Sequence, residues 1–177
     1  MLMLQSQAST LLVIDFQARL TPAIDGAAEA IANAQRLVRG ADILGIPTLY
    51  TEQYPKGLGH MVPELAPPAE ALIEKTTFDS TRAPGFLDRL PQDRALVVSG
   101  CEAHICVLQT VLGLIEADRD VYVVADAVGS RKAESKRIAL SRMEQAGATL
   151  VTTEMVLFEW VGDARHPRFK EISALVK

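Results

Sequence analysis

The sequence predicts an α/β protein: a three-layer αβα sandwich built on a Rossmann-like, mostly parallel sheet of six strands. Three observations favour this fold class. Short apolar runs rich in β-branched residues recur along the chain without alternating with polar residues, which is typical of strands buried on both faces. Helical patterns lie between these runs, as crossovers between parallel strands require. The chain has 177 residues, 49% hydrophobic and 23% charged, and this length fits the single domain that we predict over 1–177.

Six segments form the predicted sheet. The segment near 71–75 has the weakest strand pattern. The segment at 46–50 carries Pro47 near its start, where a proline removes no ladder hydrogen bond. The other four segments are continuous apolar runs at 11–14, 95–98, 121–124 and 149–151.

Helical patterns fill the intervals between these strands. The predicted helices cover 27–44, 105–117 and 132–146, and Gly45 and Gly147 stand where the first and third should end. Near the C-terminus, Phe158 and Trp160 indicate a further helix that packs on the sheet or on a neighbouring subunit. Two basic pairs, Arg131-Lys132 and Lys136-Arg137, fit the solvated face of the third helix.

Composition excludes several classes of protein. The net charge is −4 with both signs mixed along the chain, which disfavours a nucleic-acid or anionic-membrane partner. No apolar run reaches the ~18–20 residues of a membrane helix, and the opening ten residues lack the pattern of a signal peptide. The only cysteines are Cys101 and Cys106, which is typical of a reducing compartment rather than of a disulfide scaffold. We therefore expect a cytoplasmic protein.

The predicted sheet also indicates where a ligand binds. In open parallel sheets, ligands bind beyond the carboxyl ends of the strands. The segments that follow the predicted strands are 15–17, 51–53, 75–77, 99–106, Asp126 and 152–154. Functional side chains should come from this set.

Cys106 is the strongest candidate for a nucleophile. It stands where a strand and loop give way to a helix, so unpaired N–H groups and the helix dipole should lower the pKa of its thiol and favour the thiolate. Many free cysteines are simply small buried hydrophobes, and this reading stays open for Cys106. Cys101 is interpreted as a packing residue, because its spacing from Cys106 does not form the C-x-x-C motif of a redox pair.

Asp15 and Lys75 complete a reactive set with Cys106. Asp15 ends an apolar strand, where a carboxylate is costly to bury without a partner, although a capping or turn aspartate fits equally well. Lys75 by itself reads as a solvated surface lysine. Together, the carboxylate can accept the thiol proton, the ammonium can hold the carboxylate, and the thiolate can attack a carbonyl.

Metal and cofactor motifs do not appear. His60, His104 and His166 form no metal-ligand spacing with one another or with a carboxylate, so we expect no metal. No phosphate loop follows residues 57–59, and no dinucleotide fingerprint follows the first strand, so we expect no cofactor.

Four motifs resemble a known family. Residues 100–107 read GCEAHICV and resemble the G-x-E-x-H-x-C-V nucleophile segment of the isochorismatase-like cysteine hydrolases. Residues 15–17 are similar to the D-x-Q start of that family. Residues 51–59, TEQYPKGLG, and 74–78, EKTTF, resemble its metal-free branch, typified by isochorismatase domain-containing proteins. The resemblance extends from about Thr10 to Trp160.

The resemblance implies particular site residues. It implies an Asp–Lys–Cys triad carried by Asp15, Lys75 and Cys106, and a cis peptide bond between Cys101 and Glu102. It further implies an oxyanion hole formed by the backbone N–H groups of Glu102 and Cys106. The true isochorismatases lack the nucleophilic cysteine, and the nicotinamidases bind metal through an Asp-x-His segment that residues 51–53 do not supply. From the matched segments we also select five candidates for the substrate pocket: Phe16, Gln17, Gln53, Tyr54 and Phe78.

The predicted function is hydrolysis of a C–N bond in a small amide or related acyl compound, through a thioester on Cys106. Two alternatives stay open: a hydrolase that uses the same triad on another small electrophilic substrate, and a non-catalytic scaffold or interaction subunit. We expect a small-molecule substrate and a homo-oligomer. Members of the family usually associate, and the apolar segment 155–160 offers surface for such association.

Overall fold

The computed structural model describes residues 3–177, so Met1 and Leu2 of the predicted domain and opening segment lie outside the described residues. Its centre is one six-stranded sheet in the order β3-β2-β1-β4-β5-β6, with every neighbouring pair parallel. The strands are β1 Ser9–Ile14, β2 Thr48–Gln53, β3 Leu72–Lys75, β4 Ala95–Cys101, β5 Val121–Gly129 and β6 Thr149–Val151. This architecture confirms the predicted fold class.

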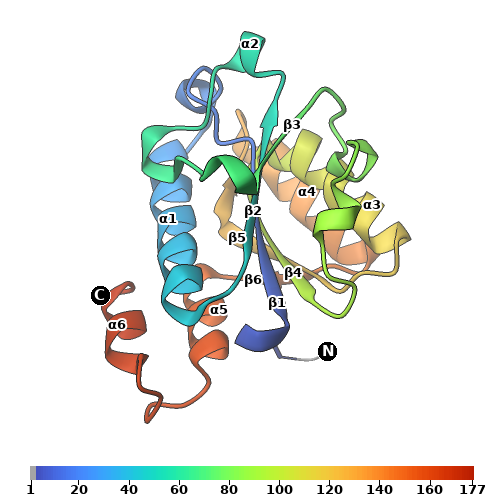
Figure 1. The fold of residues 1–177 in the computed structure, drawn as a ribbon. Helices are drawn as coiled ribbons and strands as arrows, with labels where there is room; N and C mark the ends of the chain where they lie inside the picture. Colours follow the sequence, from blue (N-terminus) through green and yellow to red (C-terminus); the bar gives the residue numbers. More distant parts are fainter. Residues whose placement is uncertain (1–2) are drawn as a thin grey trace.

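Helices cover both faces of the sheet (Figure 1). The group on one face comprises α1 Ala27–Leu44, α5 Thr153–Val161 and α6 Phe169–Ala174, and the group on the other comprises α3 Leu108–Glu116 and α4 Ala133–Ala146. The one-turn helix α2 Pro55–Leu58 follows β2 and lies at the top of the view, beyond the carboxyl ends of the strands. Short 3₁₀ turns lie at Ser6–Ala8, Thr21–Ala23, Pro63–Leu65, Ala69–Ala71, Ser80–Arg82 and Leu87–Arg89.

The sheet separates two hydrophobic cores. Alternate residues of each strand point to opposite faces. Thus Leu11 and Val13 of β1 join the core under α1 and α5, whereas Leu12 and Ile14 join the core under α3 and α4. Because both faces are buried, every residue of β1 is buried, and this explains the continuous apolar run in its sequence.

Two strands continue beyond their apolar runs. β4 extends through Ser99, Gly100 and Cys101, because Gly100 pairs with Ile14 on one side and with Val128 on the other. A Cβ atom at Gly100 would lie 2.4 Å from the carbonyl oxygen of Ile14, so only glycine allows this close approach. β5 likewise extends to Gly129. The extended ends bring β4 and β5 to the edge where ligands bind.

The structure refines two predicted elements, the helix over 105–117 and the C-terminal helix that contains Trp160. The predicted helix 105–117 divides into a π-helical turn, Ala103–Val107, followed by α3. In α5, the Trp160 indole is buried and its Nε1 donates to Ser9 Oγ at 3.0 Å, so it packs on the sheet of its own chain. No helix within residues 3–177 is both long and apolar enough to span a membrane.

Candidate active site

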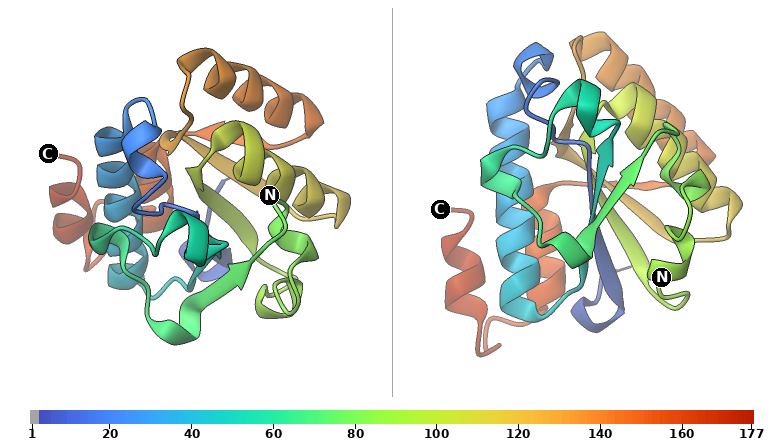
Figure 2. Two further views of the ribbon diagram at one scale, coloured as in Figure 1. Left: turned by 90° about the horizontal axis from the view of Figure 1, so that it is seen from above. Right: turned by 45° about the horizontal axis from the view of Figure 1, so that its top comes forward.

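The switch point of the sheet lies between β1 and β4. Strand order reverses there, since the chain builds outward from β1 to β3 and then returns to place β4 on the other side of β1. Ligands of doubly wound folds bind at this switch point. Asp15 follows β1 and residues 102–106 follow β4, so both segments reach the same end of the sheet. Figure 2 shows this end from above, with the segments after β1 and β2 on one side of β4 and the turn before α3 on the other.

Asp15 is fully buried and its carboxylate has three side-chain partners. Oδ1 accepts from Thr51 Oγ1 at 2.7 Å and Oδ2 accepts from Lys75 Nζ at 2.7 Å, while the third partner, the Cys106 thiol, lowers the pKa of the carboxyl group. Its backbone is left-handed, with φ of 53°. The Asp15 N–H donates to the Thr51 carbonyl at 3.1 Å. This turn away from the strand direction directs the carboxylate towards the ends of β2, β3 and β4.

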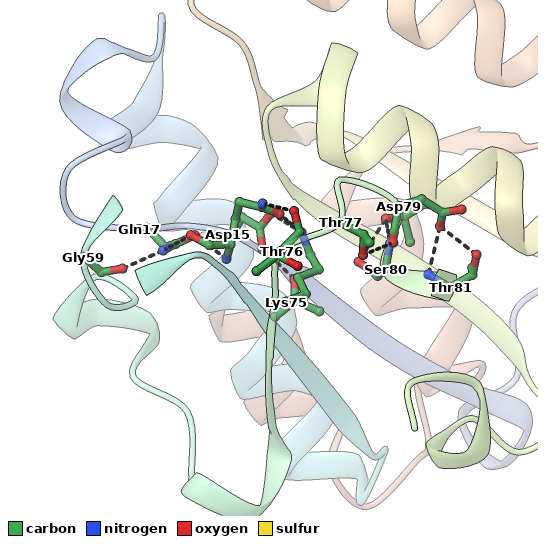
Figure 3. Close-up of polar contacts among 12 residues, drawn as sticks. Asp15, Gln17, Gly59, Lys75, Thr76, Thr77, Asp79, Ser80 and Thr81 are labelled. Carbon is green, nitrogen blue, oxygen red and sulfur yellow. Dashed lines mark hydrogen bonds and ion pairs between the residues drawn. The ribbon is translucent and has the colours of Figure 1, made fainter. Parts of the chain in front are cut away.

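Lys75 is a buried lysine, not the surface residue that its local sequence suggests. None of its side chain is exposed, and Nζ donates to Asp15 Oδ2 and, at 2.8 Å, to Gln53 Oε1. A buried ammonium needs such partners, because an unpaired charge would be strongly destabilising there. The structure thus joins Asp15, Lys75 and Cys106, which are far apart in sequence, into one connected group. Figure 3 shows Lys75 and Asp15 side by side within a wider network.

Gln17 and Gln53 hold this network in place. The Gln53 N–H donates to Gln17 Oε1 at 2.7 Å, and Gln17 Nε2 returns a bond to the Gln53 carbonyl at 3.0 Å. Gln17 also donates to the Gly59 carbonyl at 2.5 Å, and Gln53 Nε2 donates to the Thr76 carbonyl at 2.7 Å (Figure 3). Both side chains therefore have fixed partners inside the protein. Their contacts support the triad and the loops beside it, a role that differs from the predicted contact with substrate.

Cys106 lies in the π-helical turn, with 6% of its surface exposed. Turns of this kind occur often at functional sites. Burial, together with the negative charge of Asp15, raises the pKa of the Cys106 thiol to about 12, and Lys75 opposes the rise. The expectation of a lowered pKa is therefore wrong, because desolvation and a neighbouring anion outweigh the dipole at the helix start. The raised pKa favours the protonated thiol, and Asp15 is the neighbouring group suited to accept its proton.

Burial also dominates at Asp15. It raises the pKa of this carboxyl group, whereas Lys75, Thr51 and Cys106 all lower it by charge or by hydrogen bonding. Because Lys75 and Thr51 stabilise the carboxylate form while burial makes it a stronger base, Asp15 is suited to accept a proton.

Glu102 is the last residue before the π-helical turn. Its peptide bond with Cys101 is cis, and its carbonyl accepts from the N–H groups of Ile105 and Val107 at 3.0 and 3.2 Å. Its buried carboxylate accepts from Arg131 Nε at 2.9 Å. Arg131 is solvated as expected, with 56% of its side chain exposed, but it lies just before α4 and contacts this carboxylate. The sequence gives no indication that Arg131 contacts the Glu102 carboxylate.

A second buried glutamate lies nearby. Glu52 accepts from the Met61 N–H at 2.6 Å and lies 3.0 Å from His60 Nδ1. The pairing of His60 with a carboxylate was not predicted, since a spacing of eight positions matches no ligand motif. Within residues 3–177, no group of three or more His, Cys, Asp or Glu side chains is arranged to hold a metal ion.

The three aromatic pocket candidates have different environments. Phe16 is fully buried in the core under α1, so its prediction as a pocket residue is corrected: as the neighbour of Asp15, it points to the opposite side. Tyr54 lines a cavity of about 360 Å³ to which Lys75 also contributes. Phe78 lines a separate cavity of about 370 Å³ beside α3.

Comparison with known proteins places these residues in a family. The family model of the isochorismatase domain matches residues 9–155 of this chain. Isochorismatase domain-containing protein 2 of Danio rerio is 40% identical over 175 residues, which cover 98% of this chain and 89% of that protein. Isochorismatase domain-containing protein 1 of Salmo salar is 42% identical over 166 residues, which cover 92% of this chain but 59% of that longer protein.

Solved structures share the fold. A MAR1 ribonuclease from Caenorhabditis elegans is 40% identical with a TM-score of 0.91, over 98% of this chain and 92% of that one. YcaC from Pseudomonas aeruginosa, with hexane-2,5-diol and covalent acrylamide, is 26% identical with a TM-score of 0.90, over 99% of this chain and 90% of that one. YcaC from Escherichia coli, described as an octameric hydrolase of unknown specificity, is 25% identical with a TM-score of 0.90, over 99% and 89% of the two chains.

Proposed function

Because the chain belongs to the isochorismatase family, we propose that it is a cysteine-dependent hydrolase of the amidohydrolase type, acting on a C–N bond in a small amide or related acyl compound. One observation carries the proposal: the buried Asp15 carboxylate accepts from Lys75 Nζ at 2.7 Å and lies close enough to Cys106 to raise the pKa of its thiol. A nucleophile, a proton acceptor and a cation are thereby in direct contact. The covalent acrylamide in YcaC adds support, since acrylamide is a small amide that reacts with thiols.

The contacts suggest an order of events. As the substrate carbonyl approaches, Asp15 accepts the Cys106 proton and the sulfur adds to the carbonyl carbon. Lys75 keeps the Asp15 oxygen in position and compensates the negative charge. The Glu102 and Cys106 N–H groups bind the oxyanion. Asp15 then returns the proton to the departing amine, and water hydrolyses the resulting thioester.

The raised pKa of Cys106 decides how the thiol is activated. With a pKa of about 12, very little thiolate exists at neutral pH, so proton transfer to Asp15 has to accompany attack on the carbonyl. The geometry therefore favours general-base activation over a standing thiolate.

The assay is ammonia release from a panel of small primary amides by the wild-type protein and by Cys106→Ala. We expect the wild type to hydrolyse at least one amide that Cys106→Ala does not hydrolyse. Equal rates for the two proteins, or no turnover of any amide or other small acyl compound, would count against it. An absence of turnover would favour one of the two alternatives, a non-catalytic scaffold or a hydrolase of another electrophilic substrate.

Hydrolysis of RNA is a second candidate, favoured by 40% identity to the MAR1 ribonuclease. Two observations weigh against it: the net charge is −4, and the candidate nucleophile is 94% covered, with a cavity of small-molecule size at Lys75. Incubation of labelled RNA with the wild type and Cys106→Ala separates the candidates. If the wild type cleaves RNA and Cys106→Ala does not, RNA and not an amide is the substrate.

Location and assembly complete the proposal. A small-molecule substrate without nucleic acid, a cytoplasmic location and a homo-oligomer fit the composition, the cavity and the octameric YcaC. The side chains of Met155 and Phe158 on α5 are partly exposed and suit a contact between copies. Sedimentation at micromolar concentration tests the assembly, and a monomeric mass would contradict it.

A further inference from the structure

The cavity that Lys75 helps to line has a composition suited to one kind of chemical group. We term it the Tyr54 cavity. It measures about 360 Å³ and is lined by four apolar or aromatic residues, Tyr54, Pro55, Ala83 and Pro84, by two threonines and by Lys75. Two further lining residues, Lys56 and Glu74, carry charges of opposite sign. A site of this size and character favours an uncharged, apolar group over an ion.

The cavity adjoins the proposed catalytic group at Lys75. Lys75 is one of the lining residues, while its Nζ contacts Asp15 at 2.7 Å on the buried side and its charge lowers the pKa of the Cys106 thiol. The positive charge of Lys75 is satisfied by Asp15 and is completely shielded from solvent. It therefore adds no net charge to the cavity.

Tyr54 forms one side of the cavity and is held rigidly. Its ring is 54% exposed, yet its backbone is pinned: the N–H donates to the Lys75 carbonyl at 2.8 Å, and the carbonyl accepts from Gly57 at 2.8 Å. Its φ of 39° is left-handed, a conformation that non-glycine residues adopt rarely and that often marks a functional position.

Gly57 fixes the orientation of the Tyr54 ring. A Cβ atom at Gly57 would lie 2.8 Å from Tyr54 Cδ1, so the ring lies directly against the glycine backbone. An exposed aromatic ring with a fixed orientation is a preorganised contact surface, because little side-chain entropy is lost when a ligand packs on it.

From these observations we propose that the Tyr54 cavity is the specificity subsite of the same site, and that it holds an uncharged apolar or aromatic substituent of the substrate, remote from the scissile bond. The inference rests on the proposed function, since it assigns the cavity to a substrate bound at Cys106. It identifies the substrate class as neutral amides with an apolar or aromatic substituent.

The test uses acrylamide and N-benzylacrylamide as probes. In each, the Cys106 sulfur adds to the β-carbon, an S–C bond forms, and the thiol proton is transferred to the α-carbon. Intact-protein mass spectrometry gives the rate constant of each reaction, divided by that of the same probe with free N-acetylcysteine. The benzyl probe should be preferred by on the order of tenfold, as expected when roughly 50 Å² of apolar surface is buried.

Variants assign this preference to the ring. Tyr54→Gly tolerates the left-handed backbone and should abolish the preference for the benzyl probe over acrylamide. Tyr54→Phe should retain it, and Gly57→Ala should weaken it by displacing the ring. Ile138→Ala is the matched control, since Ile138 is 53% exposed on α4 and should leave the preference unchanged. A preference absent in the wild type, retained in Tyr54→Gly, or lost instead in Phe78→Ala, would overturn the proposal.

A second measurement separates the subsite from the chemistry. Saturation-transfer NMR with benzamide on Cys106→Ser reports binding without a reaction at sulfur. Binding that is lost when Tyr54→Gly is added supports the cavity assignment even if acrylamide fails to label Cys106, a result that would contradict only the proposed function. If benzamide binds equally well with and without Tyr54→Gly, the subsite assignment is wrong, and the proposed function is unaffected.

Discussion

The end of β4 and the π-helical turn that follows it each carry one cysteine, and the two thiols differ in what surrounds them. Cys101 is fully buried in the core under α1, where the Gly129 backbone is its hydrogen-bonding neighbour. Cys106 is nearly as buried, in the core under α3 and α4, but Asp15 acts on it through a side-chain contact as well as by charge, whereas Asp15 acts on Cys101 by charge alone. Burial raises the pKa of both thiols.

This difference shows that burial alone does not distinguish a structural cysteine from a reactive one. A buried thiol without a proton acceptor is inert, because its neutral form is strongly favoured. A buried thiol beside a carboxylate can lose its proton during reaction, although its pKa is equally unfavourable. Lys75 adds to the contrast, since it opposes the rise in the pKa of Cys106.

The largest expected effect separates the two cysteines in an activity assay. Cys106→Ala should lower kcat by on the order of 10³-fold or more, because the nucleophile is lost. Cys101→Ala removes a packing sulfur and should change kcat by less than about threefold, while lowering stability by about 1 kcal/mol. Ammonia release on the substrate identified in the panel gives kcat, and circular dichroism checks folding. A large loss of kcat in folded Cys101→Ala would break the comparison.

Removal of the proton acceptor should have the next largest effect. Asp15→Asn preserves the shape but cannot accept the thiol proton, so kcat should fall by roughly 10²–10⁴-fold. Thr51→Val is the matched control: it removes the other donor to Asp15, at 2.7 Å, and leaves the base intact. It should lower kcat far less. Comparable losses in the two variants would mean that Asp15 acts by maintaining the structure.

The sequence predicted the parts of this site that depend on strand order, and it missed those that depend on individual contacts. Continuous apolar runs located the sheet, so Asp15 and Cys106 could be placed at the same edge. The burial of Lys75 left no pattern, because its partner Asp15 lies 60 residues away. The exchange of bonds between Gln17 and Gln53 likewise depends on β1 and β2 being neighbours.

The errors have physical causes as well. The pKa of Cys106 was predicted with the wrong sign, because the sequence reveals a helix start but not the desolvation or the anion that outweighs it. Phe16 was placed in the pocket because it follows a strand, although adjacent residues point in opposite directions. The ion pair of Glu102 with Arg131 was missed because it joins residues that follow β4 and β5. That two strands are neighbours does not determine which side chains make contact beyond their ends.

A third prediction tests the role of charge around Cys106. Lys75 lowers the pKa of this thiol and Asp15 raises it, so Lys75→Met should shift the alkylation profile to higher pH and Asp15→Asn should shift it to lower pH. Each shift should be about one unit or more, the usual effect of a charge at this range. Iodoacetamide labelling between pH 6 and 11, measured by mass spectrometry, gives the profiles. Arg137→Gln, on an exposed ion pair, is the control. Profiles that do not move would show that Cys106 is insulated from both groups.

The smallest expected effect concerns stability in alkaline solution, where the two thiols should behave alike. Their folded-state pKa values are raised above the free-thiol value, so between about pH 9 and pH 12 the folded protein holds thiol protons that the unfolded chain has released. Stability is therefore fully present below about pH 9 and declines as the pH rises, by about 1.4 kcal/mol per pH unit for each such thiol. Urea unfolding from pH 7 to 10.5 should show a shallower decline in Cys101→Ala and in Cys106→Ala than in the wild type. The double variant should decline least. If only Cys101→Ala flattened the curve, Cys106 would already be ionised in the folded protein, and activation by a standing thiolate would replace proton transfer to Asp15.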